Sequence, residues 1–99
     1  MIKVSIKQTK SIEEIIVTGH ANSGKYGKDL VCAAVSAIVT GTINAINEIK
    51  GSVKYGVEDG YAIIQFEDDS ESQIIAKTMI FQLKTVEESN QNFIKIINS

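Results

Sequence analysis

The spacing of apolar residues changes along this chain, and this change limits the possible folds more than any other feature of the sequence. Apolar and polar residues alternate over residues 2–7, which predicts a half-buried strand, and the isoleucine- and valine-rich residues 12–18 predict a second strand after a polar turn. From Asp29 onward, apolar residues recur at steps of three and four, which predicts a helix with Asp29 as its N-cap and Gly51 as its end.

The helix expected after Asp29 is long and rich in branched and small side chains. Its expected buried face consists of Val31, Val35, Ile38, Thr42, Ala45, Ile46 and Ile49. Its small residues predict deep burial or close packing, and they are Ala33, Ala34, Ala37, Gly41 and Ala45.

The chain then returns to strand-like patterns. Residues 52–57 and 61–66 predict two more strands, and Asp59 and Gly60 between them form an Asp-Gly hairpin signal. We therefore expect these two strands to be antiparallel neighbours.

A second helix follows an acidic turn, and Ser70 with Gln73 fits a capping box at its start. Its expected apolar positions are Ile74, Ile75, Met79, Phe81, Leu83 and Val86. Residues 93–97 predict a last short strand. This order predicts an α+β fold: one small domain over residues 1–99, with a mainly antiparallel sheet of four to five strands and two long helices packed on it.

Length, charge and cysteine content exclude several classes of protein. A length of 99 residues fits one domain, and a net charge of -2 lacks the basic footprint of a nucleic-acid binder. The longest mostly apolar run, residues 30–39, is shorter than the ~20 residues of a membrane span, and the alternating N-terminus is unlike a signal peptide. One cysteine forms no disulfide within the chain. We therefore expect a cytoplasmic protein with no direct nucleic-acid or membrane partner.

The only histidine and the only cysteine, His20 and Cys32, stand around a glycine-rich loop. Cys32 falls in the first turn of the expected helix, where unpaired N–H groups and the helix dipole favour a thiolate. His20 is the only imidazole that can exchange a proton near neutral pH, and the loop is long enough to fold it back onto the helix start. The pair is a candidate nucleophile and base, and its chemistry would be acyl transfer.

Neighbouring groups are candidates to support this pair. Asp29 lies three residues before Cys32 and Ser36 four residues after it, so all three share a helix face, and either neighbour is a candidate to orient the histidine or give polar support. The backbone N–H groups of Cys32 and Ala33 are candidates to hold the oxyanion of a tetrahedral intermediate.

The same residues have simpler structural interpretations. A lone cysteine among apolar residues is typical of a small buried hydrophobe, and a lone histidine in a glycine-rich loop is typical of a solvated surface residue. N-capping alone explains Asp29, and a hydrogen bond back to a helix carbonyl explains Ser36.

Nucleotide and metal binding fit the sequence poorly. GHANSGK at residues 19–25 has the spacing of a phosphate-binding loop, but Tyr26 stands where such a loop needs Ser or Thr. One histidine and one cysteine also leave too few ligands for a tetrahedral zinc site. We therefore expect no metal or cofactor.

The segment TGHANSGKYGKDLVCAAVSAIVTGTINAI resembles the signature of the ribosomal-processing cysteine protease family, Prp. The resemblance rests on GHA at residues 19–21, a glycine before Asp29 and DLVCAAVSA, and it extends to the length and element order of the chain. It implies a cytoplasmic, homodimeric cysteine endopeptidase. It also implies that His20 and Cys32 are the catalytic dyad, with Asp29 and Ser36 as supporting residues.

The resemblance further implies a substrate. Proteases of this family remove the N-terminal extension of the large-subunit ribosomal protein numbered twenty-seven. The extension has a hydrophobic, partly aromatic stretch before the cut and basic residues after it. A mobile loop that closes over such a peptide is expected at Gly19, Ala21, Asn22, Ser23, Gly24, Lys25, Tyr26, Gly27 and Lys28. Acidic residues are candidates to attract a basic substrate, although a solvated turn explains them as well: Glu67, Asp68, Asp69 and Glu71.

Two other classes of function stay open from the sequence. One is a non-catalytic ribosome-assembly module that binds the extension without cutting it. The other is a thiol redox sensor, which needs a partner thiol because the chain has no second cysteine. A low-pKa thiol at Cys32 near His20 would separate the protease from the module.

Overall fold

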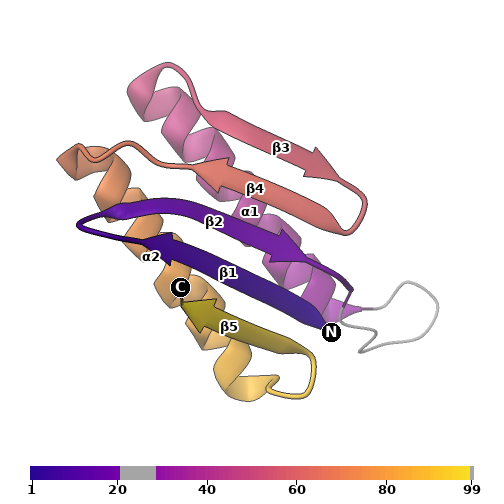
Figure 1. Ribbon diagram of the computed structural model, residues 1–99. Helices are drawn as coiled ribbons and strands as arrows, with labels where there is room; N and C mark the ends of the chain where they lie inside the picture. The colour runs from indigo at the N-terminus through magenta and orange to yellow at the C-terminus, as the bar shows by residue number, and fades with distance from the viewer. Residues whose placement is uncertain (21–28, 99) are drawn as a thin grey trace.

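The computed structural model describes residues 1–20 and 29–98. Two strands precede each helix, and a last strand follows the second helix (Figure 1). The bounds are β1 (Ile2–Gln8), β2 (Ile12–Thr18), α1 (Leu30–Lys50), β3 (Lys54–Glu58), β4 (Tyr61–Gln65), α2 (Ser70–Ser89) and β5 (Ile94–Asn98). The expected order of elements is confirmed, and each expected strand lies within two residues of its observed position.

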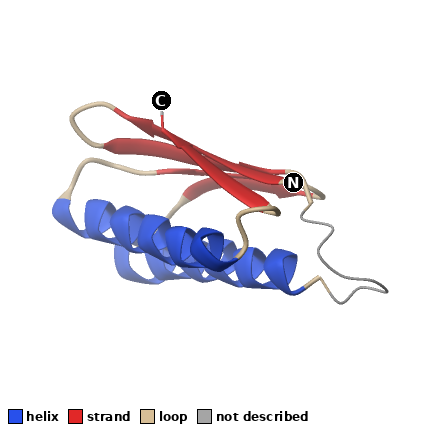
Figure 2. Cartoon of the chain, turned by 90° about the horizontal axis from the view of Figure 1, so that it is seen from below, coloured by secondary structure: helices blue, strands red, loops and turns tan. Residues whose placement is uncertain are grey.

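The five strands form one sheet in the order β3-β4-β2-β1-β5. The pairs β1–β2, β2–β4 and β3–β4 are antiparallel, and β5 returns after α2 to pair with β1 in parallel. Both helices cover the same face of the sheet (Figure 2). The predicted α+β fold with a mainly antiparallel sheet is therefore confirmed.

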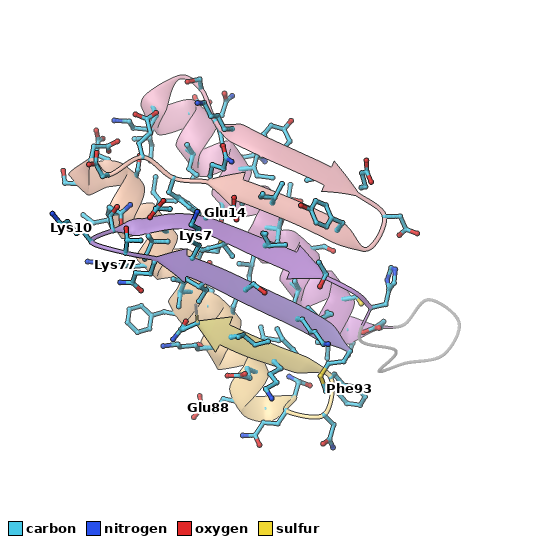
Figure 3. The ribbon with its side chains drawn as sticks, in the orientation of Figure 1. Lys7, Lys10, Glu14, Lys77, Glu88 and Phe93 are labelled. Atoms are coloured by element: carbon cyan, nitrogen blue, oxygen red, sulfur yellow. The ribbon has the colours of Figure 1, made fainter. Side chains whose placement is uncertain are left out.

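Alternation along the strands separates the covered face of the sheet from the open one. Ile2, Val4 and Ile6 of β1 point into the core and are at most 2% exposed. On the open face, Lys7 of β1 stands beside Glu14 of β2, its register partner (Figure 3). Burying each large aliphatic side chain of this core stabilises the fold by about 1.5–3 kcal/mol.

The two ends of α1 are those expected from the sequence. Asp29 has an extended backbone, and its side chain accepts a hydrogen bond from the Cys32 N–H. Gly51 closes the helix with a φ of 86°, the left-handed conformation that glycine adopts without strain. These caps place Cys32 in the first turn of α1.

The buried face of α1 differs from the expected one. Val39 and Ile43 are buried although neither was expected to be, whereas Ile49 is 54% exposed. The small residues are not deeply buried, because Ala33 and Gly41 are exposed. Close packing, the other expectation, is not found at Gly41 either, because a Cβ there would meet nothing within 4 Å. Apolar side chains occupy most of the circumference of this helix, so their spacing alone does not select the side that meets the sheet.

By length and composition, α1 is also apolar enough to cross a membrane, with a mean hydropathy of 1.7 over 18 residues, although residues 30–39 alone are too short. The helix packs on the sheet through Val31, Val35 and Val39. A core helix of a soluble protein passes the same test of length and hydropathy. The hydropathy of α1 therefore assigns no membrane location.

The start of α2 corrects the expected capping box. Asp69, one residue before Ser70, is the N-cap, and its carboxylate accepts hydrogen bonds from the N–H and the hydroxyl of Ser72. Gln73 does not cap the helix. Its amide group instead bonds both the N–H and the C=O of Ile12, at 2.8 Å each, and so joins α2 to the start of β2. Two expected apolar positions of α2 are exposed, Ile74 at 64% and Phe81 at 66%.

Part of the acidic segment has a structural role at the end of the sheet where β3 begins. Lys50 Nζ lies 3.2 Å from Asp69 Oδ1 and 3.7 Å from Glu71 Oε1, which ties the end of α1 to the start of α2. The Ser72 N–H has the largest effect on the pKa of Asp69 and lowers it. Desolvation opposes this effect, but the Ser72 hydroxyl and Lys50 lower the pKa further, to about 2.

Replacing Asp69 by alanine should therefore lower the melting temperature at pH 7. Because the pKa of Asp69 is lower in the folded chain than in the unfolded chain, its contribution is present above about pH 4 and disappears as the pH falls towards 2. The difference in Tm between wild type and Asp69→Ala should shrink over that range in thermal unfolding followed by circular dichroism. The exposed neighbour Asp68 provides the control, Asp68→Ala. An equal difference at pH 7 and pH 2 would contradict the assignment.

Candidate active site

A cavity of about 220 Å³ lies between the start of α1, the end of β2 and the turn that joins β3 to β4. His20 and Cys32 both line it, and so does Ser36. Most of the remaining wall is apolar and includes Val17, Val35, Val39, Val57 and Ala62. The structure thus brings the candidate dyad to one apolar cavity. A larger cavity of about 340 Å³, at the other end of the sheet near Lys50, is lined by neither histidine nor cysteine.

Cys32 is half-buried in the first turn of α1. Its N–H donates to Asp29 Oδ1 at 2.9 Å, which fixes the helix start around it. At this position the positive end of the helix dipole favours a negative charge on the side chain. The buried-hydrophobe interpretation explains Cys32 poorly, because a thiol at the wall of an open cavity is accessible to a ligand.

His20 lies two residues after the end of β2, and its side chain lines the cavity and is 55% exposed. Its Nε2 lies 3.7 Å from Asp59 Oδ1, beyond hydrogen-bond distance. Among the described residues, His20 has one carboxylate at ion-pair distance, that of Asp59. The Asp59 side chain is 98% exposed, so water screens this interaction.

The backbone conformation of Gly19 determines the direction in which the chain continues to His20. Its φ is 89°, and its N–H donates to the Gly60 C=O at 2.9 Å. A Cβ at this position would overlap the backbone carbonyl oxygen of Met1, which precedes β1. Position 19 therefore requires glycine both for its backbone conformation and for its close approach to another segment.

The structure supports different roles for the two residues expected to assist the dyad. The Asp29 carboxylate caps α1 by accepting from Cys32, as the simpler interpretation predicts, and a role in orienting His20 stays a prediction. Ser36 is exposed and lines the cavity one helical turn after Cys32. It is therefore placed for polar contact with a ligand.

The two expected oxyanion donors already have partners. The Cys32 N–H donates to Asp29 Oδ1, and the Ala33 N–H donates to the Asp29 C=O at 3.0 Å. The Cys32 N–H takes part in the N-cap, and the Ala33 N–H makes the first hydrogen bond of the helix. Both bonds follow from the position of Asp29 at the N-cap. Neither N–H can bind an oxyanion unless it first leaves its partner.

Most of the expected mobile loop lies outside the described residues. Gly19 belongs to the described part, but residues 21–28 do not, and the prediction of a mobile substrate loop stays a prediction.

The turn between β3 and β4 contributes residues to the cavity that sequence reasoning missed. Glu58, Asp59 and Gly60 all line the wall beside His20. Their sequence carries a hairpin signal, which fully accounts for an Asp-Gly pair in a turn. Only the pairing of β4 with β2 brings this turn next to the end of β2, because Tyr61 is the register partner of Thr18.

Residues 1–95 match the family model described as cysteine protease Prp. The chain belongs to this family. The resemblance noted in the sequence is thereby confirmed, and with it the assignment of the chain as a cysteine protease.

Relatives of known name agree with this assignment to the Prp family. The ribosomal processing cysteine protease Prp of Staphylococcus aureus strain Mu50 is 33% identical in an alignment of 97 positions that covers 92% of each chain. The Prp of Bacillus subtilis strain 168 is 31% identical in an alignment of 107 positions that covers 97% of this chain and 96% of that one.

Solved Prp structures share the fold over its full length. The S. aureus Prp with a covalently linked product peptide has a TM-score of 0.93 and 33% identity, with 100% of both chains covered. The S. aureus Prp with a substrate peptide has a TM-score of 0.84 and 32% identity, again over 100% of both chains. This chain is therefore a ribosomal processing cysteine protease of the Prp fold.

Proposed function

We propose that this protease removes the N-terminal extension of the large-subunit ribosomal protein numbered twenty-seven, with Cys32 as nucleophile and His20 as general base and acid. The observation that carries the proposal is that the only cysteine and the only histidine of the chain, twelve residues apart, line the same cavity. The covalently linked product peptide in the S. aureus relative supports both a covalent mechanism and a peptide substrate.

The proposed reaction is acyl transfer in two halves. The Cys32 thiolate attacks the carbonyl carbon of the scissile peptide bond, and the positive end of α1 favours the negative charge that develops there. The tetrahedral intermediate collapses to a thioester as protonated His20 gives its proton to the leaving amine. A water molecule that loses a proton to His20 then attacks the thioester, and the released thiolate restores the starting state.

The apolar wall of the cavity fits the substrate that this reaction requires. Val39, Val57 and Ala62 line the space beside Cys32 and are suited to an apolar or aromatic side chain near the cut. This apolar part of the wall supports cleavage after the hydrophobic stretch of the extension, and the carboxylates of Glu58 and Asp59 in the same wall are suited to its basic residues.

A homodimer and a cytoplasmic location, which the resemblance also implies, stay predictions. The attraction of a basic substrate by the acidic segment also stays a prediction. Its residues Asp69 and Glu71 pair with Lys50, away from Cys32.

The reactivity of Cys32 towards iodoacetamide at pH 6 tests whether the thiol is activated. A cysteine with the ordinary pKa of ~8.5 is only about 0.3% thiolate at this pH, so an activated thiol should react at least about tenfold faster. Since Cys32 is the only thiol, intact mass reports its modification directly. The reaction should slow in His20→Ala. A rate equal to that of free cysteine, unchanged in His20→Ala, would favour the non-catalytic binding module.

A further inference from the structure

The β3–β4 turn lies directly against the imidazole of His20. Gly60 has a φ of 72°, and a Cβ built on it would lie 3.0 Å from His20 Nε2 and 3.5 Å from Cδ2. A distance of 3.0 Å is shorter than an ordinary carbon–nitrogen contact, so a side chain at position 60 requires the ring to move by a few tenths of an ångström. The backbone of Gly60 is thus the surface on which the ring lies.

A second contact holds the residue before His20 against the same turn. The Gly19 N–H donates to the Gly60 C=O at 2.9 Å. Gly60 therefore holds the backbone of Gly19, the residue before His20, and its own backbone also limits where the His20 ring can lie. Asp59 adds only a screened interaction at 3.7 Å.

No polar group in the described part of the chain makes a hydrogen bond with the His20 ring, since Asp59 lies beyond hydrogen-bond distance. Its side chain is also 55% exposed, so the packing around it is incomplete. Within residues 1–20 and 29–98, the ring therefore lies against Gly60 and near the screened carboxylate of Asp59.

We propose that the β3–β4 turn positions the catalytic histidine, and that Gly60 is the positioning residue because its lack of a side chain lets the imidazole lie at the cavity wall shared with Cys32. This inference rests on the proposed role of His20. It gives Gly60 a function beyond turn formation. A left-handed turn position also accepts asparagine, whereas any side chain at position 60 requires the ring beside it to move.

Gly51 supplies a matched control for this proposal. Its φ of 86° is similar to that of Gly60, but a Cβ on Gly51 meets nothing within 4 Å. Gly60→Ala and Gly51→Ala should therefore lower Tm by similar amounts through backbone strain. Only Gly60→Ala should lower kcat on an extension peptide, by about tenfold, with little change in KM, because a displaced base slows chemistry more than binding.

A double-mutant cycle shows whether Gly60 acts through His20. Gly60→Ala should slow the alkylation of Cys32 at pH 6 in the wild-type background and have no further effect in His20→Ala. Gly60→Asn should show the same loss of kcat with a smaller loss of Tm, which keeps the test informative if the alanine variant unfolds.

The outcomes separate this inference from the proposed function. Equal kcat values for Gly60→Ala and Gly51→Ala would overturn the role of Gly60 and leave the dyad intact. An effect of Gly60→Ala that persists undiminished in His20→Ala would also overturn it. Full cleavage by His20→Ala would instead overturn the proposed function.

Discussion

Cys32→Ala and His20→Ala should each lower kcat/KM on an extension peptide by at least about 10³-fold. Without the thiol there is no nucleophile, and without the imidazole neither the thiolate nor the leaving amine has a proton partner. Both residues sit at an open cavity, and alanine is a strong helix former at position 32, so the fold should survive. Steady-state kinetics by chromatography of the cleaved peptide measures the loss.

Three comparisons make this prediction specific. The double variant should be no slower than the worse single variant, because a nucleophile and its base act as a unit. Thr40→Val changes another residue of α1 at the same cavity and should stay within about threefold of wild type. Both single variants should still bind the peptide. Cleavage by Cys32→Ala at a measurable fraction of the wild-type rate would contradict a covalent role for Cys32.

Gly19→Ala should have the second-largest effect, on stability and on activity together. A side chain here would overlap the Met1 carbonyl oxygen, which is backbone and cannot move without displacing the start of β1. Ile2, the first residue of β1, is also held by a hydrogen bond from its N–H to the Phe93 C=O at 2.8 Å. We expect a loss of stability of roughly 1–3 kcal/mol from backbone strain, together with a fall in kcat/KM of about 10²-fold from the displaced histidine.

Gly51→Ala again serves as the comparison for Gly19→Ala. Both positions have φ near 90°, but Gly51 has open space around it. Thermal unfolding should therefore show a larger loss of Tm for Gly19→Ala than for Gly51→Ala, and only Gly19→Ala should impair cleavage. Equal losses of Tm would show that the approach of Gly19 to Met1 has no energetic consequence.

Local signals predicted the elements of this fold well, and tertiary contacts explain where they failed. The alternation in β1 and the caps at Asp29 and Gly51 depend on a few neighbouring residues, so the sequence alone locates them. The sequence alone does not locate the side of α1 that faces the sheet. Apolar residues surround this helix, and only packing selects Val39 over Ile49. Gln73 fits a local capping box but bonds the distant backbone of Ile12 instead.

The candidate site divides in the same way. His20 and Cys32 were identifiable because each is the only residue of its type, and the family signature suggested them as a candidate dyad. The expectation that the N–H groups of Cys32 and Ala33 are unpaired is wrong, because Asp29 accepts hydrogen bonds from both, and their role at an oxyanion stays a prediction. Asp59 and Gly60 carried only a turn signal, and the β2–β4 register places them beside His20.

The most direct test of the account is to incubate the wild-type protein with the extended ribosomal protein and to measure intact masses. A parallel incubation with the same ribosomal protein lacking its extension provides the control. The account predicts one truncated product, shorter by the extension, from the first incubation and no change in the second. An extended protein that binds but keeps its full mass would contradict the proposed reaction and favour a non-catalytic role on that substrate.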